Sequence, residues 1–135
     1  MSIALVRTAL ETKLNAISPA LASAWENVPY TPVTGTPYQA CFLMTATPDN
    51  NTLGCAHYKE QGLFQISLFY PLQIGAQVAE VRADLIRTIF KRGTSMASGG
   101  LTVHVPSTPT VGQGRVDGDR WHVPIKIFFY ADVML

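Results

Sequence analysis

Residues 62–93 constrain the fold more than any other part of the chain. Residues 63–70 alternate apolar and polar side chains, which predicts a strand that ends at Pro71. Residues 78–90 repeat apolar side chains at spacings of three and four, which predicts an amphipathic helix. Gly93 follows that helix and supplies a left-handed cap. A strand joined directly to a helix, in a chain that elsewhere shows mostly strand and turn patterns, predicts an α+β fold.

The same spacing predicts which sides of these two elements are buried. On the strand, the apolar side consists of Phe64, Ile66, Leu68 and Tyr70. On the helix, the predicted apolar face consists of Val78, Val81, Leu85, Ile86, Ile89 and Phe90, with Glu80, Arg82, Asp84 and Arg87 mostly opposite.

The remaining segments complete a two-helix, mostly antiparallel architecture. A first helix is predicted before Pro19, with one apolar stripe made of Ile3, Val6, Leu10, Leu14 and Ile17. A proline-rich segment at residues 25–38, which we call the arm, follows. The next segment, 38–46, is predicted to be a strand that is covered on both faces or nearly so. Further strands are predicted at 53–59, 101–105, 111–116 and 121–129, and the loop 94–100 is predicted to be mobile. The expected order is α-β-β-(β)-α-β-β-β, with both helices on one face of the sheet.

The last third of the chain contains a hairpin and an irregularity. Asp117-Gly118 predicts a tight turn between two strands. Pro124 has no backbone donor, so its strand is expected either to lie at an edge or to be bulged there, and an edge would leave backbone groups for another subunit. Gly112 and Gly114 are not followed by a helix, so a β-bulge or an edge irregularity is preferred to a phosphate loop.

Composition limits the class of protein. A chain of 135 residues corresponds to one domain, residues 1–135. Charged residues make up 14%, against about 25% in an average soluble domain, so part of the surface is expected to contact protein. The net charge is +1 and no basic stripe is present, which argues against nucleic acid as the main partner. Apolar runs are too short to cross a membrane, and the N-terminal region lacks the pattern of a signal peptide, so a cytoplasmic protein is expected.

No residue pattern indicates a catalytic, cofactor or metal site. Cys41, Cys55 and His57 have too few ligands and too wide a spacing for structural zinc, and both cysteines are interpreted as buried or half-buried thiols. His104 and His122 are expected to point to solvent or to a subunit contact. Serine nucleophile motifs are missing, and the acids near the Asp117 turn lack further calcium ligands. The chain is therefore predicted not to be an enzyme.

The two tryptophans leave their roles open at this stage. Trp121 is favoured as a core residue, whereas Trp25 fits the core and an interface equally well.

Several segments, taken in order, resemble those of phage tail terminator proteins. They are residues 3–14, Ala24-Trp25-Glu26-Asn27-Val28-Pro29-Tyr30, Pro37-Tyr38, residues 62–75, Phe90-Lys91-Arg92-Gly93, and Gly118-Asp119-Arg120-Trp121 with the strand up to Phe129. The resemblance rests on the order and spacing of packing and turn motifs and covers nearly the whole chain. It implies a small structural protein of long-tailed phages or prophages that assembles in the host cytoplasm. It also implies a hexameric ring that caps the tail tube and offers a surface to the head, with other copies, the tube protein and a head-tail connector as partners.

Two sets of residues are candidate contact sites under this reading. The subunit interface is predicted to include Trp25, Tyr30, Pro32, Tyr38, Asn50, His57 and Lys59, from the arm and the loop 47–59. Contact with the tube or the head is predicted for Asp117, Asp119 and Arg120.

Two alternatives remain from the residues alone. The first is a small-ligand or enzymatic domain that uses Tyr58, His57, Tyr70 or His122. The second is a monomeric adaptor that adds a partner's strand to its sheet edge.

Overall fold

The computed structural model describes residues 2–50 and 53–134 and confirms an α+β fold with two helices and a mostly antiparallel sheet. In chain order, the elements are α1 (Ser2–Asn15), β1 (Ala22–Ala24), β2 (Tyr38–Thr45), β3 (His57–Pro71), α2 (Gln77–Ile89), β4 (Ser95–Ser98), β5 (Leu101–His104), β6 (Thr110–Val111), β7 (Arg115–Asp117) and β8 (Arg120–Met134). Within the described residues, no helix is long and apolar enough to cross a bilayer.

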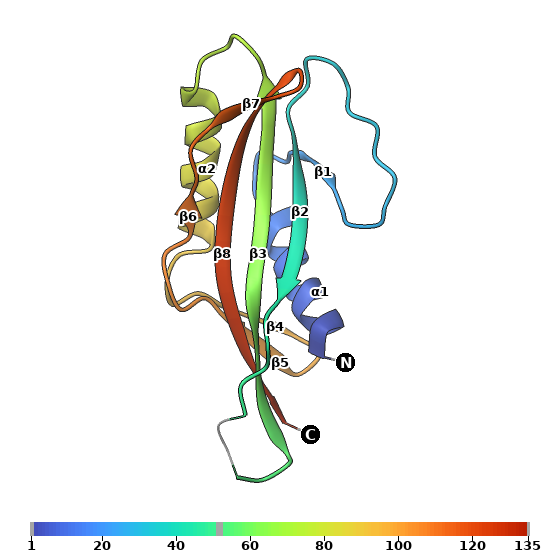
Figure 1. The fold of residues 1–135 in the computed structure, drawn as a ribbon, viewed down its shortest axis with the longest axis vertical. Coiled ribbons are helices and arrows are strands. Elements are labelled where there is room, and N and C mark those ends of the chain that lie inside the picture. Colours follow the sequence, from blue (N-terminus) through green and yellow to red (C-terminus); the bar gives the residue numbers. More distant parts are fainter. Residues whose placement is uncertain (1, 51–52, 135) are drawn as a thin grey trace.

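Two long strands form the axis of the molecule. β3 and β8 pair antiparallel over 15 residues each, from His57 opposite Met134 to Pro71 opposite Arg120. β2 pairs with the other side of β3, and the short β1 runs parallel to β2. The free side of β8 is covered in turn by β7, β6 and β5. Figure 1 shows this elongated sheet facing the viewer, with α1 behind it.

The core lies between the sheet and the helices. Phe64, Ile66 and Leu68 of β3 are fully buried, as the alternation predicts. They meet the matching residues of β8 and the stripe of α1 that contains Leu10 and Leu14. Burying each such side chain contributes about 1.5–3 kcal/mol, so this layer supplies most of the stability.

The predicted buried face of α2 is partly wrong. Val78 and Val81 are 47% and 62% exposed, while Ala79 and Ala83 have almost no exposed surface. The two alanines have small side chains, which lets the helix backbone lie close to the sheet. Arg82, predicted to face outward, is buried and donates to the carbonyl oxygen of Pro19. The small residues, rather than the branched ones, therefore set the rotation of this helix.

Three local predictions also need correction. The predicted loop 94–100 contains β4, which forms a hairpin with β5 through Gly99 and Gly100, both with positive φ. No separate strand exists at 53–56, because the long β3 begins at His57, where it pairs with β8; its pairing with β2 begins at Gly62. Residues 51–52 of the neighbouring loop lie outside the described residues. Ile3 is exposed although it belongs to the predicted stripe of α1.

The strand that contains Pro124 is not at an edge. β8 has β3 on one side and β6 and β7 on the other, and the irregularity lies in the segment 112–114 between those two short strands. Gly112 donates its N–H to the Pro124 carbonyl at 2.8 Å, and a Cβ on Gly112 would lie 2.7 Å from the Pro124 ring. A Cβ on Gly114 would lie 2.4 Å from the Trp121 ring. Glycine at positions 112 and 114 thus allows the backbone of this segment to pass close to the rings of Pro124 and Trp121.

Candidate assembly surfaces

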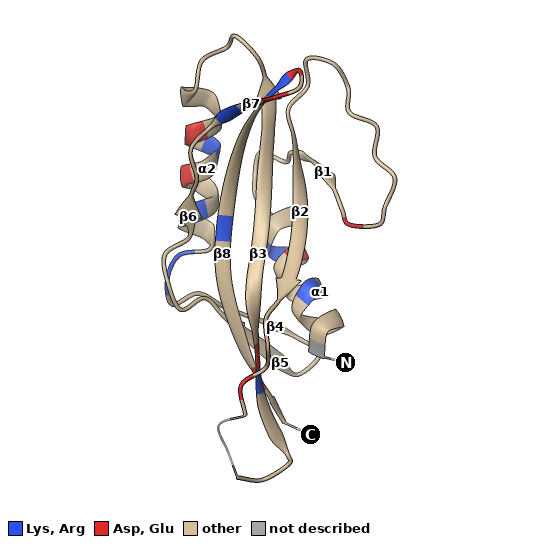
Figure 2. Ribbon diagram, in the orientation of Figure 1, with Lys and Arg blue, Asp and Glu red and all other residues tan. Residues whose placement is uncertain are grey.

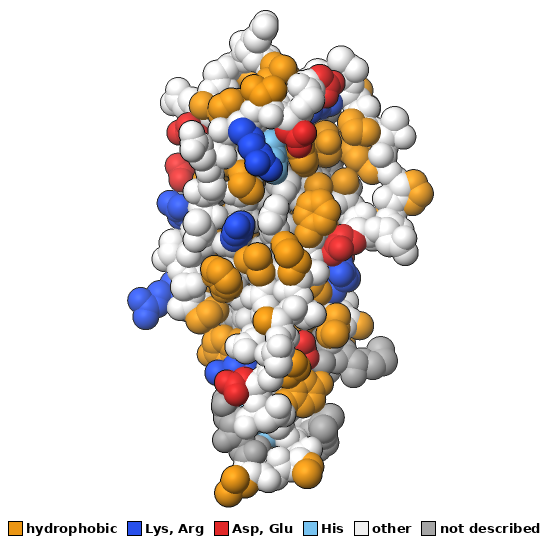
Figure 3. Space-filling model, viewed as in Figure 1, with side chains coloured by type: hydrophobic (Ala, Val, Ile, Leu, Met, Phe, Trp, Pro, Cys, Tyr) orange, Lys and Arg blue, Asp and Glu red, His pale blue; other side chains and the backbone are white. Residues whose placement is uncertain are grey.

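One face of the sheet is open. Because side chains alternate along a strand, residues next to the core residues of β2, β3 and β8 point away from both helices. On this open face, Met44, Leu63 and Phe128 lie side by side in register. Phe42, Met44 and Phe128 are 40%, 44% and 48% exposed, and Figure 3 shows apolar side chains across this face. The expectation that residues 38–46 are covered on both faces is therefore wrong.

Four rings form a column across the upper part of the open face, in which Tyr30 is tilted against Tyr38 and the following pairs are stacked. The ring centroids are 5.2 Å apart for Tyr30 and Tyr38, and 4.8 Å apart for Tyr38 and Phe69. Phe69 in turn stacks on His122 at 4.8 Å. The column therefore connects the arm to the three strands β2, β3 and β8 at this end of the open face.

A groove beside the column carries positive charge. Its lining includes Gln65, Gln113, Arg115, His122 and Lys126, which we call the basic groove, and no carboxylate lies among its lining residues. Arg115 and Lys126 have no ion pair among the described residues. The groove is therefore suited to an acidic group.

The side chain of His122 departs from expectation. It was expected to face solvent or a subunit contact, yet in the single subunit it is 6% exposed, and neither of its ring nitrogens has a hydrogen-bond partner among the described residues. Burial lowers its pKa from the ordinary value of 6.5, and Arg115 lowers it further, while Asp117 acts in the opposite direction. His122 is therefore a neutral ring at neutral pH. His104 lies elsewhere and stacks on Tyr130.

The proline-rich arm is bound to its own subunit at two places. At its start, Glu26 accepts the backbone N–H of Leu43 at 2.7 Å and pairs with Arg7 at 3.1 Å. Near its end, the guanidinium of Arg120 donates to the carbonyl of Val33 at 2.6 Å and to that of Thr36.

Arg120 thus has an internal role. It is 5% exposed, and its guanidinium lies 5.1 Å from the centre of the Tyr38 ring. The interpretation that this residue stays outside the core is corrected, because it is buried and arm carbonyls accept its hydrogen bonds; its contact with the tube or the head stays a prediction. Asp117 and Asp119 are exposed, and their contact with the tube or the head stays a prediction.

The predicted interface residues fall into separate regions. Trp25 is half-buried against the core, Tyr30 and Tyr38 belong to the column, and Pro32 is exposed on the arm. The others lie near the opposite end of the sheet, in a set made of exposed Asn50, His57 paired with Asp132 at 3.1 Å, and Lys59 with its ammonium 4.9 Å from the Tyr130 ring. Their roles in subunit contact stay predictions.

The residues of the enzymatic alternative are not brought together. Tyr70 lies on the covered face, His122 on the open face, and His57 at the far end of β3. Among the described residues, no group of three His, Cys, Asp or Glu could hold a metal ion. Cys41 is buried as expected, but Cys55 is exposed, because it lies in the loop before β3 rather than in a strand.

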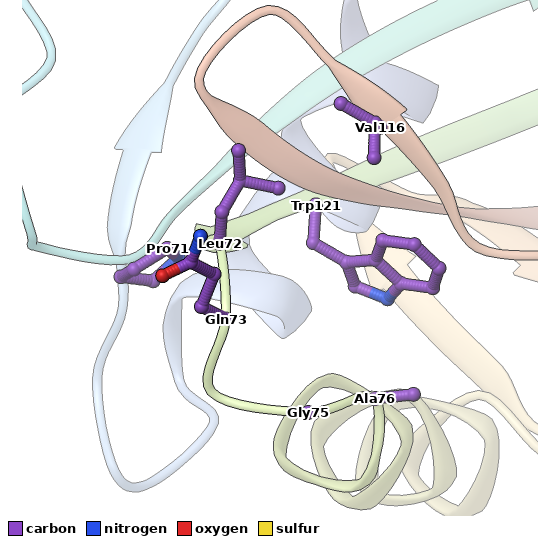
Figure 4. Close-up of a pocket in the computed structure, with 7 residues that line it drawn as sticks. All are labelled: Pro71, Leu72, Gln73, Gly75, Ala76, Val116 and Trp121. Atoms are coloured by element: carbon purple, nitrogen blue, oxygen red, sulfur yellow. The ribbon is translucent and has the colours of Figure 1, made fainter.

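An apolar cavity of about 480 Å³ lies at the upper end of the molecule, where the β3–α2 connection faces the β7–β8 hairpin. Figure 4 shows Trp121 and Val116 on one side, with Leu72 and Pro71 on the other. Sequence reasoning placed Trp121 in the core, and the structure shows a half-buried ring that packs on the core and also lines this cavity. None of the lining residues is a base or a nucleophile, so the cavity favours contact with an apolar group over catalysis.

Comparisons with known proteins identify the family. Residues 5–129 match the family model described as phage tail terminator protein. No curated protein matches the chain. Six chains of solved structures match it. One of them is 30% identical with a TM-score of 0.78, and the match covers all of this chain and 97% of the other. The resemblance seen in the sequence is thereby confirmed: the chain belongs to the phage tail terminator family and has a structural role in the phage tail.

Proposed function

We propose that this protein ends growth of the phage tail tube by assembling as a ring on its last layer, and that the ring then offers a surface to the head. Membership of the family supports this role. The observation that carries it furthest is the open sheet face, where Phe42, Met44 and Phe128 expose apolar surface that a lone subunit leaves to water. Exposed apolar patches of this kind mark protein contact sites.

A cyclic ring needs two different, complementary surfaces on each subunit, and capping adds a third. The open face, the arm with its aromatic column, and the hairpin tip at Asp117 and Asp119 are three such surfaces on separate parts of the molecule. In this proposal the partners are other copies, the tail tube protein and a head-tail connector protein, and assembly takes place in the host cytoplasm.

The edge of β2 is poorly suited to a monomeric adaptor that adds a partner's strand at this place. Strand addition needs free backbone donors along an exposed edge. At β2 the N–H of Leu43 is already bound by the Glu26 carboxylate, and residues 38–40 are paired with β1. This edge is therefore occupied over much of its length.

The test is electron microscopy of tails assembled in cells with and without this protein. Without it, tubes are expected to vary in length and to lack heads, while tails made with it have one length. Tails of equal length and normal head attachment in both cases would refute the proposal.

A second experiment tests the arm. Deletion of residues 31–36 removes exposed Pro32 and the acceptors of Arg120, and is expected to abolish the ring. An unchanged oligomer mass, measured on tubes or in solution, would remove the arm from the interface.

A further inference from the structure

The outer side of α2 carries an unusual combination of residues. Val78 and Val81 are exposed there because the alanines of this helix take the buried positions. Glu80 and Asp84 are exposed one turn apart, and neither has an ion pair among the described residues. We call these four residues the acidic face of α2. Figure 2 shows the two acidic positions on this helix.

The open face of the sheet carries the complementary combination. Exposed Phe128 and half-buried Leu63 lie in register with Met44, and Lys126 is two residues before Phe128 on the same side of β8. Arg115 lies opposite His122 on β7, so both unpaired cations border the basic groove. Figure 2 shows these basic positions on β7 and in the middle of β8.

We propose that the acidic face of α2 in one copy docks on the open sheet face of the next copy, with Glu80 and Asp84 entering the basic groove. This inference rests on the proposed ring. Val81, which lies beside the two carboxylates on the helix, would cover part of the apolar row of the neighbouring sheet, and the carboxylates would meet Arg115 and Lys126.

Charge complementarity argues for a second copy as the occupant. The same chain carries two unpaired carboxylates on one surface and two unpaired cations on another, each beside exposed apolar side chains. Glu80 and Asp84 line a groove together with Gln113 and Gly114, which also line the basic groove. Among the described residues, neither carboxylate forms an ion pair with Arg115 or Lys126 of the same subunit.

The symmetry of this contact also fits the ring. A contact between two different surfaces is heterologous, and it closes into a ring when the rotation between neighbours divides the circle. A self-complementary contact would stop at a dimer.

The buried ring of His122 lines the basic groove. Neither of its nitrogens has a hydrogen-bond partner among the described residues, whereas buried polar groups are generally hydrogen-bonded. Both nitrogens are closed off from solvent, so a carboxylate could accept the N–H of the neutral ring only after the lining side chains of the groove move. The carboxylate of Asp117 lies close enough to act on His122, yet it makes no hydrogen bond with this ring.

The experiment uses reciprocal charge changes in the full chain. One variant is Glu80→Lys with Asp84→Lys, and the other is Arg115→Glu with Lys126→Glu. Each variant opposes like charges at the contact, so its self-association is expected to weaken at least about a hundredfold. Association is measured by sedimentation velocity over a concentration series and by co-pelleting with tail tubes, and circular dichroism checks that each variant is folded.

Two rescues make the test specific. In an equimolar mixture, each variant presents the charge that the other needs, so alternating assembly is expected to recover. A chain with all four changes is expected to associate with itself again. A merely misfolded variant would not be rescued by its reciprocal partner.

The outcomes separate this inference from the proposed ring. Loss in each variant with recovery in the mixture or in the fourfold variant supports the docking. If wild type associates and both variants associate equally well, or if neither rescue restores association, the docking is refuted and the ring stands. If wild type neither associates nor binds tubes, the ring is refuted and this contact with it.

Discussion

Replacing Arg120 by Met should release the proline-rich arm while the core stays folded. The methionine keeps an apolar stem of similar length but removes the guanidinium, which donates to the carbonyls of Val33 and Thr36 and lies over the ring of Tyr38. The arm would then be held at its start by Glu26 and at its end by the aromatic column.

The magnitude follows from the two hydrogen bonds. Bonds with a charged donor contribute about 1.5–3 kcal/mol each. Residues 31–36 are exposed, so water replaces the lost donors, and removing a buried cation also returns some desolvation energy. The two bonds together would contribute about 3–6 kcal/mol, and these compensations bring the expected net loss to the bottom of that range or just below it, about 2–3 kcal/mol. In a domain of this size, each kcal/mol lowers Tm by about 3–4 °C, so the expected decrease is about 6–12 °C.

Native-state hydrogen exchange locates the effect. Two amides report on the arm, because Val28 donates to Trp25 and Thr36 donates to Val33. If the arm opens as a unit, a loss of 2–3 kcal/mol in the stability of its closed state raises the exchange rates of these two amides about 30- to 140-fold. Amides of β3 should change far less. Arg115→Met on the same hairpin is the control, since Arg115 is exposed and donates to no arm carbonyl. If Arg120→Met leaves arm exchange within about threefold of wild type, the arm is not held by this residue.

Three further changes test the fold and the groove. Gly62→Ala should destabilise the protein by about 3 kcal/mol in urea unfolding, because its Cβ would lie 2.3 Å from the backbone oxygen of Met44 and would force β2 away; an unchanged midpoint would contradict the close packing of these strands. The pKa of His122 is lowered in the folded chain, so the unfolded chain takes up a proton near pH 6.5, whereas the folded chain does so only at lower pH. The stability of the fold should therefore decrease as the pH drops below about 6.5 towards the lowered pKa. His122→Phe should reduce this pH dependence relative to wild type, and identical pH profiles of Tm would show that the residue is not buried. Burial raises the pKa of the Cys41 thiol to about 12, while Cys55 is exposed, so a thiol reagent at pH 8 should label one cysteine in the native protein and two in denaturant; rapid native labelling of Cys41 would argue against its place in the core.

Strands and turns are predicted well where the alternation of apolar and polar side chains agrees with the residues that end a strand, such as proline or an Asp-Gly pair. The strand before Pro71 and the turn at Asp117-Gly118 were found because a period of two, a proline and an Asp-Gly pair each constrain the backbone locally. The family resemblance was also readable, since it rests on the order of such local signals.

The side of α2 that faces the sheet could not be predicted in the same way. Hydrophobicity alone favours burying valine over alanine, but the buried positions are set by how closely the helix backbone can approach the sheet. Arg82 and Arg120 were missed for a related reason: their acceptors are the carbonyls of Pro19, Val33 and Thr36, far away in sequence. The open face could not be recognised either, because an apolar strand in a sequence does not reveal which neighbouring layer is missing.

The apolar residues whose burial was predicted wrongly share one physical feature. Val78 and Val81 belong to the predicted apolar face of α2, and Phe42 and Met44 belong to a strand that was expected to be covered, yet all four are exposed in the single subunit. Exposing them costs the monomer the burial energy that each side chain would otherwise contribute, about 1.5–3 kcal/mol when burial is complete. In the proposed ring, contact with a neighbouring copy would recover that energy. The proposal therefore assigns these exposed apolar residues to the contacts between subunits.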